Sequence, residues 1–230
     1  MRDVSSSPLP EPVLRSAVLA TFADETKLQT IEDFHRLYYS ATGTWRMTQW
    51  RGVPVLKSPM DLWAVRDVLW RIRPDLVIET GTACGGSALF YADCLNIQGT
   101  GHVVTIDLDE PKPLVAHPRL TYLTGGSLDE DVVADVRHFA AHCTGPVVVL
   151  LDSDHGRDHV LAELDIYAPM VTVGSALIVE DTNLSDWKGG PGPADAVSVF
   201  LPAHPEFRRE PIYERSLLTF HPGGWLTRVA

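Results

Sequence analysis

Two groups of acidic residues follow strongly apolar segments in the second half of the chain. Asp152 and His155 come after VVVLL, and Glu180 and Asp181 come after ALIV. If these segments are neighbouring parallel strands, both groups lie at the same edge of a sheet, where a cation must relieve the repulsion between the carboxylates. Oxygen ligands favour a hard ion such as Mg2+. The pattern therefore predicts a magnesium site on Asp152, Glu180 and Asp181.

A histidine accompanies the first acidic group. His155 lies three residues beyond Asp152, and imidazole titrates near neutral pH, so this side chain can accept a proton from a substrate hydroxyl. A metal ion beside that hydroxyl would assist the same deprotonation. We interpret Asp154 and Asp158 as residues of an exposed acidic loop and helix start, and His159 as an outward-facing or helix-capping residue.

A glycine-rich loop follows the apolar segment 75–78 and leads into a helical pattern. Its sequence, ETGTACGGS, contains Glu79, Gly81, Thr82 and Ser87. In a doubly wound sheet, the strand ends and a helix N-terminus form a ligand crevice at this place. Glycines let the backbone approach a ligand, and the helix N-terminus favours a negative group such as a carboxylate. Taken alone, the loop fits a cofactor site and a tight turn equally well.

An acid ends the next apolar segment. Asp107 closes HVVTID, where a carboxylate can accept both hydroxyls of a ribose; the alternative is a solvated turn residue. The order strand, E-x-G-x-x-x-G-G, helix, strand, acid fits S-adenosylmethionine (SAM) better than a dinucleotide, because Glu79 would repel a pyrophosphate. Ser127 follows a third apolar segment, RLTYLTG, and fits both an adenine-binding loop and the N-cap of a helix over 128–142.

The elements that must position these residues form an alternating pattern. Short apolar segments over 75–78, 102–106, 147–151 and 176–179 alternate with helix-compatible segments. This alternation predicts an α/β fold with βαβ units and a doubly wound, mostly parallel sheet. The final segment, RSLLTFHPGGWLTRV, predicts a closing antiparallel hairpin around 222–224. The helix-compatible segments are 61–72, 87–95, 128–142, 158–167 and 193–201.

The first part of the chain has a different character. Residues 1–15 are rich in proline and serine and predict a loose arm, and one or two short helices are expected over 13–39. We expect an N-terminal arm and helical cap over residues 1–50 and a cofactor-binding domain over 51–230. Several residues have two interpretations, as packing or solvated residues or as parts of a lid or active site: Tyr38, Tyr39, Trp45, Trp50, Lys57 and Trp187.

The composition is that of one globular domain: 230 residues, 45% hydrophobic and 21% charged. No segment reaches the roughly 20 apolar residues of a membrane-spanning helix, and the N-terminus lacks a signal-peptide pattern, so we expect a cytoplasmic protein. The net charge of −11 opposes binding to nucleic acid or anionic membranes and favours a small-molecule enzyme. Three cysteines without CxxC spacing indicate neither a disulfide framework nor a zinc site.

From about Tyr38 to its end, the chain contains the segments IETGTACGGSALFYAD, VVTIDLD, LLDSDHGRDHVLAELDIYAPMVTVGSALIVEDT and LTFHPGGWLTR. In these segments it resembles the family of cephalosporin hydroxylases and macrolide-sugar O-methyltransferases. The resemblance implies a Rossmann-like methyltransferase fold, SAM as cofactor, His155 as general base, a homo-oligomer, and Mg2+ on the three acids predicted above. The residues expected at the cofactor are Glu79, Gly81, Thr82, Ser87, Asp107, Ser127 and Asp152.

The leading function is methyl transfer from SAM to a hydroxyl of a small secondary metabolite, held on Mg2+ through vicinal oxygens. A sugar and a catechol both fit this description. One alternative is a component of a cephalosporin-type hydroxylase, which would require iron, oxygen and a reductant. Another is a non-catalytic partner scaffold. The intact glycine loop and acidic residues favour methyl transfer.

Overall fold

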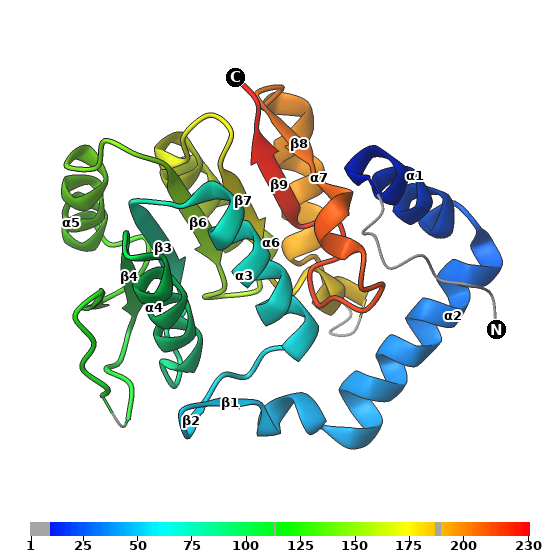
Figure 1. Ribbon diagram of the computed structural model, residues 1–230, viewed down its shortest axis with the longest axis horizontal. Helices are drawn as coiled ribbons and strands as arrows, with labels where there is room; N and C mark the ends of the chain where they lie inside the picture. The colour runs from blue at the N-terminus through cyan, green and yellow to red at the C-terminus, as the bar shows by residue number, and fades with distance from the viewer. Residues whose placement is uncertain (1–9, 113, 187–189) are drawn as a thin grey trace.

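The computed structural model describes residues 10–112, 114–186 and 190–230, and a seven-stranded sheet forms its centre (Figure 1). The strands of this sheet are β3 (Leu76–Thr80), β4 (His102–Asp107), β5 (Leu120–Thr124), β6 (Val147–Leu151), β7 (Ala176–Val179), β8 (Phe207–Arg209) and β9 (Trp225–Arg228). Their order is β5-β4-β3-β6-β7-β9-β8. The first five of these pair in parallel, and β9 is antiparallel to both its neighbours. The predicted mostly parallel sheet is confirmed.

The central strands are apolar on both faces because helices cover the sheet on each side. Every residue of β3, β6 and β7 is buried. Neighbouring strands are in register, with Val77 beside Val148 and Ile78 beside Val149. Since successive side chains alternate between the faces, these two pairs belong to two different hydrophobic clusters.

Two helical layers cover the sheet, with α3 and α4 in front of it in Figure 1. Leu69 of α3 and Tyr91 of α4 share one core cluster, and Leu164 of α6 and Phe200 of α7 share the other. Within the described ranges, no helix is long and apolar enough to cross a membrane. The helices after residue 58 are α3 (Pro59–Ile72), α4 (Gly86–Gln98), α5 (Glu130–Ala141), α6 (Arg157–Tyr167) and α7 (Pro193–Ala203), with short η3 (Ala168–Met170), η4 (Thr182–Asp186) and η5 (Pro211–Glu214).

The N-terminal part is helical from Glu11, so the loose arm expected over 1–15 is wrong for residues 11–15; residues 1–9 lie outside the described chain. Pro10 precedes the first turn, and Arg15 donates a hydrogen bond to Glu210, which ties the helix to the body of the protein. Two helices are present, as expected. The elements are α1 (Glu11–Phe22), α2 (Glu25–Arg36), π-helical η1 (Leu37–Thr42), η2 (Thr44–Met47), β1 (Gln49–Trp50) and β2 (Val53–Pro54).

The closing antiparallel pair exists, but its first strand differs from the one expected. Strand β9 pairs with β8 rather than with residues 216–220. The backbone of Phe220 is engaged elsewhere: its N–H donates to Asp61 and its carbonyl accepts from Asn183. These bonds hold the segment before Pro222 beside the ends of the sheet strands, where it cannot form a ladder.

Gly81 lies where the loop after β3 meets the backbone after β6. Its φ is +87°, and a Cβ there would lie 2.0 Å from the carbonyl oxygen of Asp152. We expect Gly81→Ala to lower the free energy of unfolding by at least about 2 kcal/mol. An alanine is strained at this positive φ, and its Cβ would overlap the Asp152 carbonyl, so the two costs add. Gly174→Ala is the matched control, since Gly174 has φ +84° with nothing within 4 Å. Urea unfolding that gives equal losses for both variants would contradict this account.

Candidate active site

The predicted acidic groups meet at the carboxyl edge of the sheet, where the parallel strands end. Asp152 follows β6, and Glu180 and Asp181 follow β7. Because β6 and β7 are paired in parallel, with Leu151 beside Val179, the expectation that both groups end at one edge is confirmed. Asp107 ends β4 at the same edge.

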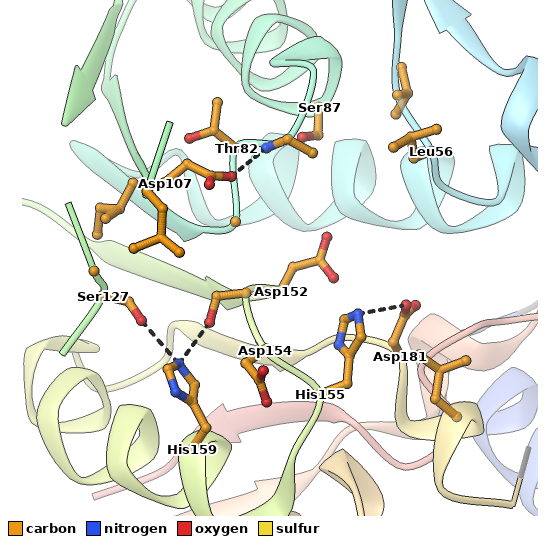
Figure 2. Close-up of a pocket in the computed structure, with 18 of the residues that line it drawn as sticks. Leu56, Thr82, Ser87, Asp107, Ser127, Asp152, Asp154, His155, His159 and Asp181 are labelled. Carbon is orange, nitrogen blue, oxygen red and sulfur yellow. Dashed lines mark hydrogen bonds and ion pairs between the residues drawn. The ribbon is translucent and has the colours of Figure 1, made fainter. Parts of the chain in front are cut away.

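A cavity of about 530 Å³ opens at this edge (Figure 2). It is lined by Gly81, Thr82, Ser87, Asp107 and Ser127, which the sequence assigned to the cofactor. Asp152, His155 and Asp181 line the same cavity. One cavity is thus lined by the predicted base and by all of the predicted cofactor residues except Glu79.

Strand β4 fixes the glycine-rich loop. The N–H groups of Gly81 and Thr82 donate to the carbonyl of Ile106 at 2.8 and 3.2 Å, and Ala83 N–H donates to Asp107 Oδ2 at 2.7 Å. The protein's own hydrogen bonds therefore hold the loop and the Asp107 carboxylate together. Such preorganisation suits recognition of a nucleoside at the strand ends.

Glu79 lies beneath the loop and is fully buried. Thr105 Oγ1 donates to its carboxylate at 2.7 Å. Burial raises the pKa of Glu79 to about 7, although the ammonium of Lys57 and hydroxyl hydrogen bonds oppose the shift. Glu79 is not among the residues that line the cavity, so its contact with a cofactor stays a prediction.

His159 faces the cavity, which corrects the expectation that it points outward or caps a helix. Its Nε2 lies 3.2 Å from Ser127 Oγ and 3.1 Å from Ser153 Oγ. The buried carboxylate of Glu163 raises the pKa of His159. Ser127 therefore binds an imidazole instead of capping a helix, and the N-cap of α5 is Asp129.

Asp152, His155 and Asp181 form a candidate metal-binding group. Each offers one ligand atom, and these atoms all lie within 4.8 Å of one another. His155 Nε2 is 3.6 Å from Asp181 Oδ2. Burial raises the pKa of Asp181 well above its usual range, and the carboxylates of Asp152 and Glu180 raise it further. A bound cation would favour the ionised form of this group.

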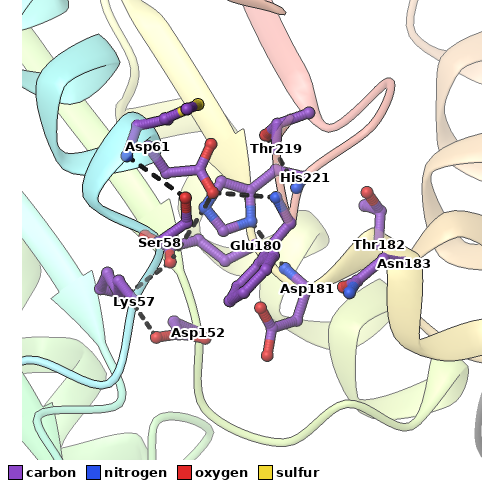
Figure 3. Close-up of polar contacts among 12 residues, drawn as sticks. Lys57, Ser58, Asp61, Asp152, Glu180, Asp181, Thr182, Asn183, Thr219 and His221 are labelled. Atoms are coloured by element: carbon purple, nitrogen blue, oxygen red, sulfur yellow. Dashed lines mark hydrogen bonds and ion pairs between the residues drawn. The ribbon is translucent and has the colours of Figure 1, made fainter. Parts of the chain in front are cut away.

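Glu180 points to a neighbouring buried cluster (Figure 3). The Nζ of Lys57, a residue only 4% exposed, donates to Asp152 Oδ2 at 2.5 Å and to Glu180 Oε2. His221 Nε2 lies 3.3 Å from Glu180 Oε2 and 3.8 Å from Asp61 Oδ2. Burial alone lowers the pKa of Lys57, but the two carboxylates outweigh it and raise that pKa well above its usual range. Lys57 thus approaches the active site, one of its two interpretations.

The site fits a divalent cation. Asp152, Asp181 and His155 supply the oxygen and nitrogen ligands that such ions accept. Glu180 Oε1 is buried and has no hydrogen-bond partner among the described residues. Since buried charged oxygens are normally paired, this atom marks a place where a further cationic partner would be stabilising.

Aromatic residues from the N-terminal part complete the cavity. Tyr39 and Trp45 line it and stack with ring centroids 5.1 Å apart. Tyr39 also contacts Phe220 edge to face at 5.3 Å. Trp50 lies elsewhere and donates to Asp93 at 2.8 Å, while Trp187 lies outside the described residues.

Two members of the buried cluster, Asp61 and His221, were not predicted from the sequence. Asp61 lies in the first turn of α3, whose N-cap Ser58 accepts a hydrogen bond from Met60 N–H at 3.2 Å. His221 lies in the turn before β9, and its Nδ1 accepts from Asp181 N–H at 2.8 Å. The sequence Lys-Ser-Pro at a helix start, followed by an acid in the first turn, could have indicated Asp61. No short-range pattern indicates His221.

Solved structures define the class of the fold. A CmcI structure without ligand has a TM-score of 0.64 at 23% identity, covering 80% of this chain and 77% of that one. A putative caffeoyl-CoA O-methyltransferase from Staphylococcus aureus has a TM-score of 0.53 at 14% identity, covering 86% of this chain and 93% of that one. The fold is therefore the Rossmann-like fold of O-methyltransferases.

Sequence comparison gives the family. Residues 42–229 match the family model "Rhamnosyl O-methyltransferase/CmcI". A rhamnosyl O-methyltransferase of Mycobacterium leprae is 31% identical over 86% of this chain and 90% of its own length. One from Mycobacterium tuberculosis is 30% identical over 86% of this chain and 84% of its own length. The chain belongs to the rhamnosyl O-methyltransferase/CmcI family and is a methyltransferase, which confirms the resemblance noted in the sequence.

Proposed function

We propose that the protein transfers a methyl group from SAM to a hydroxyl of a small molecule and that a divalent cation, Mg2+, assists the transfer. One observation carries this proposal. The cavity that is lined by Asp107 and the glycine-rich loop is also lined by the candidate metal group of Asp152, His155 and Asp181. A solved CmcI structure with Mg and SAM, 23% identical to this chain, supports the same pairing of ligands.

The chain's own residues have separate tasks in this reaction. Asp107 accepts hydrogen bonds from the ribose hydroxyls, and the loop at Gly81 and Thr82 directs the sulfonium toward the acidic group. When bound to Asp152 and Asp181, the metal ion supplies positive charge that favours the acceptor's alkoxide. His155 takes the hydroxyl proton while the acceptor oxygen bonds to the methyl carbon, and the S–C electron pair stays on sulfur. Asp181, 3.6 Å away, stabilises the resulting imidazolium.

The acceptor in this proposal is a glycoside. Tyr39, Trp45, Leu56 and Leu184 line the cavity that also contains His155, so an acceptor with an apolar face next to its hydroxyls fits. Sugar rings have such faces, and the relatives' names specify a rhamnosyl group. We propose that residues 1–50 form a cap that supplies the two aromatic rings and that residues 51–230 form the catalytic domain.

The test is methyl transfer from isotopically labelled SAM, followed by mass spectrometry. The acceptors are p-nitrophenyl α-L-rhamnopyranoside, methyl α-L-rhamnopyranoside and catechol, each with Mg2+ and with EDTA. The proposal predicts a methylated rhamnoside that forms only with Mg2+, and faster with the aryl glycoside. Methylation of catechol alone would contradict the sugar acceptor, and equal rates in EDTA would contradict the metal.

The donor set also bears on the hydroxylase alternative. The usual non-haem iron site has two histidines and one carboxylate. The candidate group here, within the described chain, has one histidine and two carboxylates. Two further histidines lie nearby. His159 points its Nε2 at the hydroxyls of Ser127 and Ser153. His221 accepts the Asp181 N–H at its Nδ1 and lies with its Nε2 3.3 Å from Glu180 Oε2. This arrangement favours methyl transfer.

Asp107→Asn tests the cofactor site by itself. The substitution keeps the side-chain size but removes the charge that accepts the ribose hydroxyls, so we expect SAM affinity to fall at least about tenfold. Calorimetric titration of SAM measures the change. Asp109→Asn, a change two residues further along the chain at an exposed position, is the control and leaves affinity unchanged. Equal affinities of all three proteins would place the ribose elsewhere.

A further inference from the structure

The ammonium of Lys57 occupies a position that bears directly on metal binding. It donates to Asp152 Oδ2 and Glu180 Oε2, and it is almost fully buried among them. Asp152 also belongs to the candidate metal group with His155 and Asp181. The same carboxylate therefore faces a lysine on one side and a metal-binding group on the other.

Two cations cannot share these carboxylates without a cost. A divalent ion bound by Asp152 would share that carboxylate with the Lys57 ammonium, and like charges repel strongly where water is excluded. Both cations also use the carboxylate of Asp152, because Lys57 Nζ donates to its Oδ2 and the same side chain offers a ligand atom to the candidate metal group. Lys57 and a divalent cation are thus alternative counter-charges for one pair of carboxylates.

The backbone beside Lys57 has the features of a place that can rearrange. Leu56 is not a glycine but has φ +60°, a left-handed conformation that persists only where the surroundings impose it. Leu56 is 38% exposed and lines the cavity. On the other side of Lys57, Ser58 caps α3 through Met60 N–H, so the helix start is fixed. A movement of Lys57 is therefore easiest through the strained residue before it.

We propose that Lys57 is an internal counter-cation that exchanges with the divalent ion, so that metal binding moves the Lys57 ammonium off Asp152 and toward the cavity. The inference rests on the proposed metal dependence and adds a regulating residue to it. Lys57 keeps the carboxylates paired when the ion is absent and lowers the affinity for the ion. Metal occupancy is thereby coupled to the position of Leu56 at the cavity wall.

Substitution of Lys57 separates this role from a purely structural one. Lys57→Met keeps the length and the apolar part of the side chain but removes the charge. We expect it to bind Mn2+ at least tenfold more tightly than wild type, measured by electron paramagnetic resonance of free Mn2+. We also expect it to unfold at a lower temperature than wild type in EDTA, a difference that shrinks with saturating Mn2+. Lys27→Met, which removes an exposed lysine paired with Asp24, should change neither quantity.

A second measurement uses the wild-type protein and does not depend on how the variant folds. Acetic anhydride labelling followed by peptide mass spectrometry reports the accessibility of each lysine. If Lys57 exchanges with the divalent ion, it is acetylated faster with Mg2+ than with EDTA, while the exposed Lys27 reacts equally in both.

The outcomes distinguish a failure of the proposed exchange of Lys57 from a failure of the proposed metal dependence. Wild type that binds Mn2+, together with a folded Lys57→Met protein that binds it equally or more weakly, would overturn the exchange alone. Acetylation of Lys57 that does not respond to Mg2+ would do the same. Absence of Mn2+ binding by both proteins would overturn the metal dependence and the exchange together.

Discussion

His155→Asn is expected to lower kcat for methyl transfer by about 10²–10⁴-fold, because general-base catalysis contributes a factor of this size. His155 lines the cavity and lies 3.6 Å from Asp181, which can orient the imidazole and stabilise its protonated form. Asparagine keeps a polar group of smaller size but cannot take the proton. Steady-state kinetics with labelled SAM measures the loss, and the variant's residual rate should rise with pH as hydroxide replaces the base.

The His155→Asn variant also decides whether His155 is a general base or a metal ligand, since the imidazole of His155 belongs to the candidate metal group. A base predicts unchanged Mn2+ and SAM affinities beside the lost turnover. A ligand predicts a large loss of Mn2+ affinity, and activity that returns at high metal concentration. Retention of wild-type kcat would remove His155 from the mechanism.

Asp181→Asn is expected to weaken Mn2+ binding by at least about 100-fold. Even the substitution of a residue that only hydrogen-bonds to a metal ligand lowers metal affinity by about 10–100-fold. Asp181→Asn should also stabilise the protein in EDTA. Burial and the nearby carboxylates raise the pKa of Asp181, so its ionised form destabilises the fold above the pKa of the unfolded chain, and the amide removes this cost. Calorimetric titration and thermal unfolding measure the two effects.

A matched control for Asp181→Asn is Asp158→Asn, which neutralises an exposed acid in the first turn of α6. It should leave both Mn2+ affinity and thermal stability in EDTA close to wild type. An Asp181→Asn protein that binds Mn2+ as wild type does, or that unfolds at a lower temperature in EDTA, would show that the carboxylate has a different role.

The parallel sheet was predictable because its signal is local. Strands such as β6, with the sequence VVVLL, are apolar without alternation, as both faces are covered. Acids directly after β6 and β7 follow from the same rule, since parallel neighbours end at one edge. The closing strand pair was harder, because the residues before Pro222 bond to Asp61 and Asn183, partners far away in the sequence.

The buried cluster beneath the site was only partly predictable for the same reason. Lys57 and Asp152 are 95 positions apart, and neither neighbourhood specifies the other. Glu180 follows β7 as predicted, but the direction of its side chain depends on Lys57 and His221 packed around it. The direction of the His159 side chain was predicted wrongly, because its Nε2 contacts the hydroxyls of Ser127 and Ser153, which lie in two different loops.

In the proposed mechanism, the cofactor methyl group and the divalent ion meet in one cavity at the carboxyl edge of the sheet. The most direct measurement is the paramagnetic relaxation of S-[methyl-13C]-SAM bound to the wild-type protein, recorded by NMR with Mn2+ and with Mg2+. The account predicts that Mn2+ strongly broadens the methyl signal, and that Asp181→Asn abolishes the broadening although SAM stays bound. A methyl signal that is the same with Mn2+ and with Mg2+ would contradict a shared site for metal and cofactor.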